Sequence, residues 1–292
     1  MDTEFFNLRA MLQQEESCYQ INDFFQKLPP QSSESLLTVD IDARKEIAQW
    51  CISVVKVCEY SAETAAIIMS SLDRFVSTPE DSETLLDRFQ YQLAALTAIY
   101  LSAKIHCARV LSSENVAKLS RGAFTAEDVE AMERGMLKEI QWRVSPPTAM
   151  NFVRIYLDLL TLSNNIFDRG TQDTVLELVG YQTNLSIVQF EISTTKASQI
   201  AKASLLIAVE NIYSSNSEIY ETMRRFLSLS SDIDHKPITY LMQKLSKAIP
   251  VENGVNVESQ VRSSIIHRDS FPKSPRSVYK HNLTIRMQCN VN

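Results

Sequence analysis

Glycine is scarce in this chain of 292 residues, which contains five. Loops that bind phosphate through backbone amides, and tight β-hairpin turns, rely on glycine because it adopts left-handed backbone conformations without strain. The patterns His-Glu-x-x-His, Gly-x-Gly-x-x-Gly, Gly-x-x-x-x-Gly-Lys and Gly-x-Ser-x-Gly are also absent from the sequence. We therefore predict a non-catalytic protein that needs no cofactor.

The five cysteines form no recognisable disulfide or metal-binding pattern. Their number is odd, no Cys-x-x-Cys pair occurs, and most of them, such as Cys51 and Cys58, lie within apolar segments. The sequence also lacks a cationic leader followed by an apolar stretch, and it has no unbroken run of about eighteen apolar residues. We expect reduced, buried thiols in a soluble intracellular protein that has no membrane partner.

Basic residues are in the minority outside the C-terminal end. The net charge is −6, but residues 251–292 hold six Lys or Arg against three Asp or Glu, so the preceding residues carry −9. An acidic body repels the phosphate backbone of nucleic acids. The composition therefore predicts no nucleic-acid partner.

Apolar residues at helical spacing are abundant. Ile47, Trp50, Cys51, Val54 and Val55 recur at intervals of three and four residues, which is the pattern of a helix with one buried face. Residues 93–104 are apolar on nearly every side, as expected of a helix surrounded by other helices. After an amphipathic segment within residues 1–30, the sequence predicts helices at 42–58, 61–76, 93–104, 112–120 and 125–141.

The second half of the chain repeats this organisation. A new helix is expected to start at Ser145-Pro146-Pro147, because proline is tolerated in a first helical turn. Residues 196–208 share the small, all-round apolar character of residues 93–104, at a spacing of about 105 residues that indicates a duplication. The sequence thus predicts an all-α fold with an N-terminal helical segment at 1–34, two five-helix domains at 35–145 and 146–250, and a disordered basic tail at 251–292.

Two charged pairs share one spacing in the first domain. Arg44 precedes Asp73 by 29 residues, and Lys104 precedes Glu133 by 29 residues. With Leu93 and the segments Arg-x-x-x-x-x-Trp (44–50), Leu-Asp-Arg-Phe (72–75) and Met-Glu-Arg-Gly-Met-Leu-Lys (132–138), this pattern resembles the cyclin box. Residues 35–250 are similar to a cyclin with two tandem five-helix folds, and residues 11–16 and 142–148 are most similar to D-type cyclins. The resemblance implies a regulatory protein of the nucleus and cytoplasm.

The first pair has a physical explanation that does not depend on the family. Arg44 lies in the first turn of one predicted helix and Asp73 near the end of the next, so each charge opposes the dipole of its own helix. Antiparallel neighbours would bring these two ends together, and an arginine–carboxylate pair would then join the helices. The alternative is a pair of ordinary solvated charges. The joint spacing favours a structural ion pair.

The second pair is predicted to bind a partner. In cyclins, the charges that match Lys104 and Glu133 form hydrogen bonds to the partner kinase, and a charged couple beside apolar anchors is typical of a binding hot spot. The resemblance therefore implies a kinase interface made of Leu101, Lys104, Glu133, Leu137, Trp142 and Val144. The alternative is an ordinary surface lysine and glutamate. Ile105, His106 and Cys107 depart from the aromatic and acidic residues usual after the family's lysine, and His106 is assigned no role.

A second surface implied by the resemblance would dock Arg-x-Leu peptides of kinase substrates. Ile47, Trp50 and Gln92 match the family at this patch. Positions 43, 46 and 53 hold Ala, Glu and Ser where the family usually has Met, Ile and Glu. We therefore expect a weakened docking patch.

The function predicted from the sequence is that of a regulatory cyclin, which binds and activates a cyclin-dependent serine/threonine kinase in cell-cycle control. Ser274, which precedes Pro275 in the basic tail, is a candidate phosphorylation site for a proline-directed kinase. The alternative is an adaptor of the general initiation factor type, which shares the duplicated fold. That function calls for a basic face and a zinc ribbon, and neither is evident in this sequence.

Overall fold

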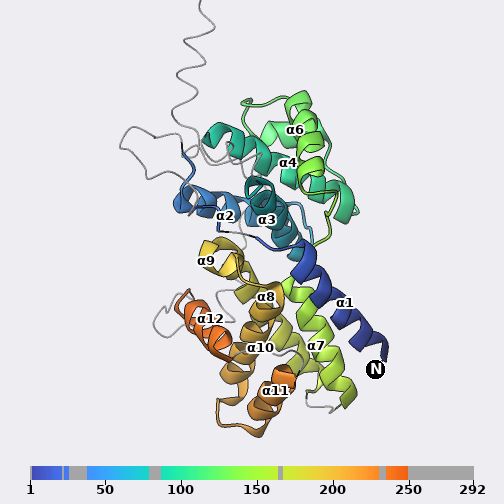
Figure 1. The fold of residues 1–292 in the computed structure, drawn as a ribbon, viewed down its shortest axis with the longest axis vertical. Helices are drawn as coiled ribbons and strands as arrows, with labels where there is room; N and C mark the ends of the chain where they lie inside the picture. Colours follow the sequence, from blue (N-terminus) through green and yellow to red (C-terminus); the bar gives the residue numbers. More distant parts are fainter. Residues whose placement is uncertain are drawn as a thin grey trace, which may run out of the picture.

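The computed structural model describes residues 2–21, 23–25, 38–78, 87–163, 167–229 and 235–248. These residues form helices and no strands (Figure 1). The predicted disordered tail at 251–292 and the candidate phosphorylation site Ser274 lie outside them. The helices are α1 (Asp2–Cys18), α2 (Ile41–Val57), α3 (Glu63–Val76), α4 (Arg88–His106), α5 (Ser113–Leu119), α6 (Ala126–Glu139), α7 (Ala149–Ser163), α8 (Arg169–Val188), α9 (Phe190–Ser193), α10 (Ala197–Tyr213), α11 (Glu218–Leu229) and α12 (His235–Ala248).

The first fold is built around α4. This helix is buried along nearly its whole length, from Phe89 to Ala103, and packs against α3, α5 and α6. Side-chain caps fix where the surrounding helices begin: Asp40 Oδ1 accepts a hydrogen bond from Ala43 N (2.7 Å), and Thr125 forms the expected capping box with Asp128. Local sequence therefore sets the helix starts, and burial of apolar faces sets the packing.

The second fold repeats this arrangement around α10. Residues from Ile200 to Val209 are all buried, and α10 contacts α7, α8, α11 and α12 (Figure 1). The predicted all-α class with two tandem folds is confirmed.

The start of α7 differs from the prediction. The helix begins at Ala149, so Pro146 and Pro147 precede it instead of lying in its first turn. Thr148 Oγ1 accepts a hydrogen bond from Asn151 N (3.2 Å), and Asn151 Oδ1 accepts one from Thr148 N (2.9 Å). This reciprocal pair is the capping arrangement that stops a helix from starting earlier.

The N-terminal helix belongs to the core of the second fold. Leu8 is 5% exposed within that core, with Met11 and Leu12 packed beside it, and α1 lies along α7 (Figure 1). In return, Ile187 at the end of α8 and Phe190 in α9 belong to the core of the first fold. Each fold therefore borrows apolar side chains from a distant part of the chain.

Candidate functional site

Arg44 and Asp73 form a buried ion pair. Arg44 Nε donates to Asp73 Oδ1 (3.0 Å) and Nη2 donates to Oδ2 (2.6 Å), with side chains 0% and 1% exposed. Arg44 also donates to Ile187 O and to Ser193 Oγ, at 3.0 Å each. Because these last two acceptors lie in α8 and α9, one guanidinium joins α2 to α3 and the first fold to the second.

The electrostatics of this pair are those of a structural contact. Burial lowers the pKa of Arg44, but the carboxylate of Asp73 and its hydrogen bonds more than offset this, so the pKa of Arg44 lies above its usual value. The ring of Phe190 covers the guanidinium at 5.1 Å. A bidentate, covered pair of this kind holds the helices in place.

Lys104 and Glu133 form the second pair, at the surface. Lys104 Nζ lies 3.1 Å from Glu133 Oε1 and 3.3 Å from Oε2, and the side chains are 49% and 11% exposed. The hydrogen bond that Lys104 donates to Glu133 raises the pKa of Lys104. The pair lies where the end of α4 meets α6, so an approaching partner meets a positioned ammonium beside a largely covered carboxylate.

Apolar side chains occur close in sequence to this second pair, at the end of α4 and just after α6. Trp142 is 73% exposed, Ile105 is 43% exposed, and Val144 is half-buried. We call Lys104, Glu133, Ile105, Trp142 and Val144 the α4–α6 surface. Leu137 is 9% exposed at its base, whereas Leu101, predicted to lie in the interface, is 2% exposed and belongs to the core. The prediction for Leu101 as a contact residue is wrong because its face of α4 packs inward.

A strained turn presents Trp142. Gln141 and Trp142 both have left-handed backbone conformations, with φ of 55° and 58°, which non-glycine residues rarely adopt. Arg74 stabilises this turn by donating hydrogen bonds to Ile140 O (3.1 Å) and Arg143 O (2.7 Å). Burial lowers the pKa of Arg74 to about 10. His106 Nε2 lies 2.9 Å from Val144 O. Sequence reasoning missed both Arg74 and His106, because their role is to hold a backbone distant in sequence.

The predicted docking patch for substrates is not a surface. Ile47 and Gln92 are 0% exposed and Trp50 is 5% exposed. The helix that carries Ile47 and Trp50 packs against α3 and α4 and also against α8 and α9. The second fold therefore contributes to enclosing α2, and the prediction of an open patch at these three residues is wrong.

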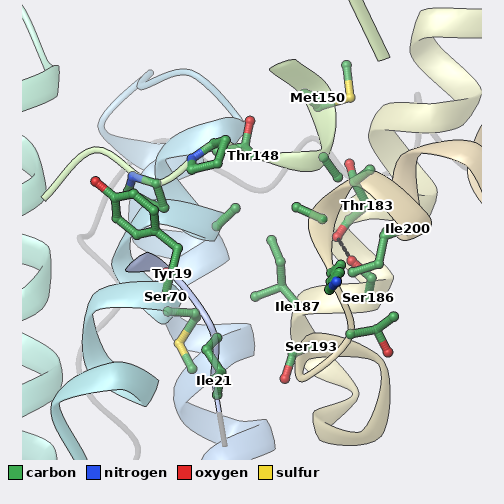
Figure 2. A pocket seen from close by; sticks show the side chains of 18 of the residues that line it. Tyr19, Ile21, Ser70, Thr148, Met150, Thr183, Ser186, Ile187, Ser193 and Ile200 are labelled. Carbon is green, nitrogen blue, oxygen red and sulfur yellow. Dashed lines mark hydrogen bonds between the residues drawn. The ribbon is translucent and has the colours of Figure 1, made fainter. Parts of the chain in front are cut away.

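A pocket of about 330 Å³ lies where the two folds meet. Figure 2 shows Tyr19 and Ser70 on one side, with Thr183, Ile187 and Ile200 facing them on the other. At its wall, Glu15 Oε1 accepts from Ser198 N (2.9 Å) and Oε2 accepts from Ser198 Oγ (2.6 Å). Glu15 thus caps the start of α10 from another part of the chain, and burial raises its pKa.

Among the residues that the structure describes, no three His, Cys, Asp or Glu side chains are grouped so as to hold a metal ion. None of the helices there combines the length and apolar character that a bilayer crossing requires.

Two protein-family models match this sequence, one over each fold. The family described as "Cyclin, N-terminal domain" matches residues 8–145, and "Cyclin, C-terminal domain" matches residues 147–274. The chain belongs to the cyclin family. The two matches meet in the segment between α6 and α7, so each covers one of the folds.

Named relatives are distant. This cyclin is 23% identical over 175 residues to Cyclin-B1-1 of Oryza sativa subsp. japonica, which covers 60% of this chain and 37% of the relative. It is 23% identical over 214 residues to the G2/mitotic-specific cyclin-B of Drosophila melanogaster (71% and 38%), and 26% identical over 148 residues to the G1/S-specific cyclin-E of Caenorhabditis briggsae (48% and 28%). The chain thus matches less than half of the length of each of these relatives. These relatives are named as B- and E-type cyclins, so they do not support the predicted similarity to D-type cyclins.

A solved structure supports the fold. The viral cyclin from herpesvirus saimiri superposes with a TM-score of 0.62 at 16% identity, covering 83% of this chain and 96% of the viral one. At this identity the likeness concerns the fold, and the roles of individual residues rest on the geometry described above.

Proposed function

We propose that this cyclin binds and activates a cyclin-dependent serine/threonine protein kinase, in cell-cycle control, and that it acts in the nucleus and cytoplasm. The observation that carries the proposal is the α4–α6 surface, where the exposed ammonium of Lys104 is held by Glu133 and the ends of the same two helices carry the exposed side chains of Ile105 and Trp142. Relatives named as G2/mitotic-specific and G1/S-specific cyclins support the cell-cycle assignment.

The composition of the α4–α6 surface suits a protein partner. An exposed tryptophan next to a charge pair is the combination that dominates binding energy when a partner excludes water from it. Glu133 already orients the ammonium of Lys104, so less side-chain entropy is lost when a partner binds. The surface presents a basic group beside a largely covered acidic one, and it therefore suits a helix that bears polar groups beside an apolar stripe.

The proposed role is non-catalytic. Kinases transfer phosphate only when a helix of their small lobe is held inward, so that its glutamate pairs with the lysine that binds ATP. A cyclin that binds this helix in its inward position stabilises the active state and shifts the kinase population toward it. All catalytic groups then belong to the kinase, and this chain contributes binding energy and geometry.

A pull-down with matched variants tests the proposal. We expect the wild-type cyclin to recover a serine/threonine kinase from cell extract, and adding the cyclin to the purified kinase to raise its activity. Lys104→Ala/Glu133→Ala should reduce kinase recovery about tenfold or more. The control is Lys138→Ala/Glu139→Ala, which removes a lysine–glutamate pair on α6 where Lys138 is 83% exposed.

Two outcomes would contradict the proposal. Undiminished kinase recovery by Lys104→Ala/Glu133→Ala, with circular dichroism showing a folded protein, would place the interface elsewhere. Binding to promoter DNA in a mobility-shift assay, abolished by charge reversal, would instead support the initiation-factor type of adaptor.

A further inference from the structure

A second pocket lies within the second fold, between α10, α11 and α12. Its volume is about 510 Å³. These three helices lie at the far end of the molecule from α4 and α6 (Figure 1), so the pocket is separate from the α4–α6 surface. The proposed kinase-binding function makes no use of it.

A buried lysine lies at the inner wall of this pocket. Lys202 is 0% exposed and is the sole charged residue in the buried stretch from Ile200 to Val209. Its Nζ donates to Leu227 O (2.9 Å) in the last turn of α11, and the ring of Tyr156 lies 5.7 Å away. Burial lowers the pKa of Lys202 to about 8. The negative end of the α11 dipole offsets part of the cost of this charge.

The mouth of the pocket is also basic. Arg224 on α11 and Lys247 on α12 line it and are exposed. Glu210 is the acidic residue of the lining, and Glu221 lies 3.3 Å from Arg224 on the same helix. Three cations therefore surround the cavity against fewer carboxylates, which favours an anionic occupant.

The remaining wall is apolar. Leu206, Leu227, Ile238 and Met242 contribute aliphatic surface from all three helices. A cavity of this size, mostly apolar with a few charged groups at one side, is typical of sites for small organic ligands. Inorganic anions would leave the aliphatic wall unused, and neutral apolar molecules would make no use of the excess of positive charge around the cavity.

We propose that this pocket binds a small amphipathic anion, with an apolar chain or ring against the aliphatic wall and the anionic group toward Arg224 and Lys247. Lys202 is a positioning residue: covered by other atoms, it acts through its charge in a region of low dielectric and makes no direct contact. The assignment depends on pocket shape and charge, and it is independent of the kinase.

Calorimetry with three probes tests the ligand class. Decanoate carries both features, 1-decanol lacks the charge, and acetate lacks the apolar body. We expect the full-length protein to bind decanoate about tenfold more tightly than either of the other two. Equal affinity for 1-decanol, or no heat from decanoate at millimolar concentration, would overturn the proposal.

Matched variants test whether the anion binds in this pocket. Arg224→Gln/Lys247→Gln should weaken decanoate binding about fivefold. Arg225→Gln/Lys244→Gln makes the same charge change on the same two helices away from the pocket lining, and should leave binding unchanged. Met242→Trp should block the cavity without changing charge. An equal loss in the control pair, or full binding by Met242→Trp, would refute the location.

Lys202→Met separates the positioning role from a structural one. We expect this variant to keep its affinity for 1-decanol and to lose most of the preference for decanoate over 1-decanol. A purely structural role would change both affinities alike, and that result would overturn the role of Lys202.

Discussion

Arg44–Asp73 and Lys104–Glu133 share a spacing of 29 residues, yet they occupy opposite environments. The first pair is 0% and 1% exposed, and the second is 49% and 11% exposed. The first makes further hydrogen bonds across the boundary between the folds, whereas the second meets solvent at the end of α4. The same charges at the same spacing thus join helices inside the fold in one region and lie at the surface in the other, where we propose that they bind a partner.

The sharpest test of this difference compares two alanine variants. Arg44→Ala should lower the free energy of unfolding by about 3–5 kcal/mol, because it leaves Asp73 buried without its counter-charge. Lys104→Ala, in the exposed pair, should lower it by about 1 kcal/mol or less. Urea unfolding followed by circular dichroism measures both. Equal stability losses would show that burial does not separate the pairs.

Lys202 is a third case, a buried cation whose ammonium donates to a backbone carbonyl, that of Leu227. Its pKa falls from 10.5 to about 8 on folding, so between these values the unfolded chain binds more protons than the folded one. The free energy of unfolding should therefore rise with pH from about 8 to 10.5, by about 2–3 kcal/mol relative to Lys202→Met. The measurement is urea unfolding of both proteins across this pH range, and a constant difference would contradict it.

At the α4–α6 surface, the largest effect should fall on binding. Trp142→Ala should weaken kinase binding by about 2 kcal/mol, because it removes the most exposed large side chain of that surface. Stability should change little, since few contacts of the folded chain are lost. Surface plasmon resonance with the recovered kinase measures the affinity. Val110→Ala is a suitable control, because Val110 is 55% exposed outside the α4–α6 surface.

The smallest effect should come from relieving the strained turn. Gln141→Gly should raise the free energy of unfolding by about 1 kcal/mol, because glycine adopts a φ of 55° without strain. A thermal melt checks this. If the variant also weakens kinase binding, the left-handed turn is needed to orient Trp142, and unchanged binding would show that it is not.

Local features of the fold could be predicted from the sequence, and features that depend on distant packing could not. The 29-residue spacing predicted the ion pair of Arg44 and Asp73, and Thr125 with Asp128 predicted a helix start. The same spacing also singled out Lys104 and Glu133, which the structure places within hydrogen-bond distance of each other. Leu101 was misplaced because nearly every side of α4 is apolar, so periodicity does not show which side faces out. Ile47 and Trp50 were misplaced because α2 is also covered by α8 and α9, which come more than a hundred residues later. Gln92 was misplaced because it lies on α4, which is buried along nearly its whole length. Lys202 went unnoticed within a small-residue segment whose apolar pattern predicts only a central helix.

The docking of α1 onto the second fold has a consequence for synthesis. Glu15 accepts the two cap hydrogen bonds that Ser198 donates across 183 residues, so α1 leaves the ribosome long before its binding site exists. At about 5–20 residues per second, the delay is roughly ten to forty seconds. During that interval the apolar face of α1, including Leu8, lacks the core that covers it in the folded protein.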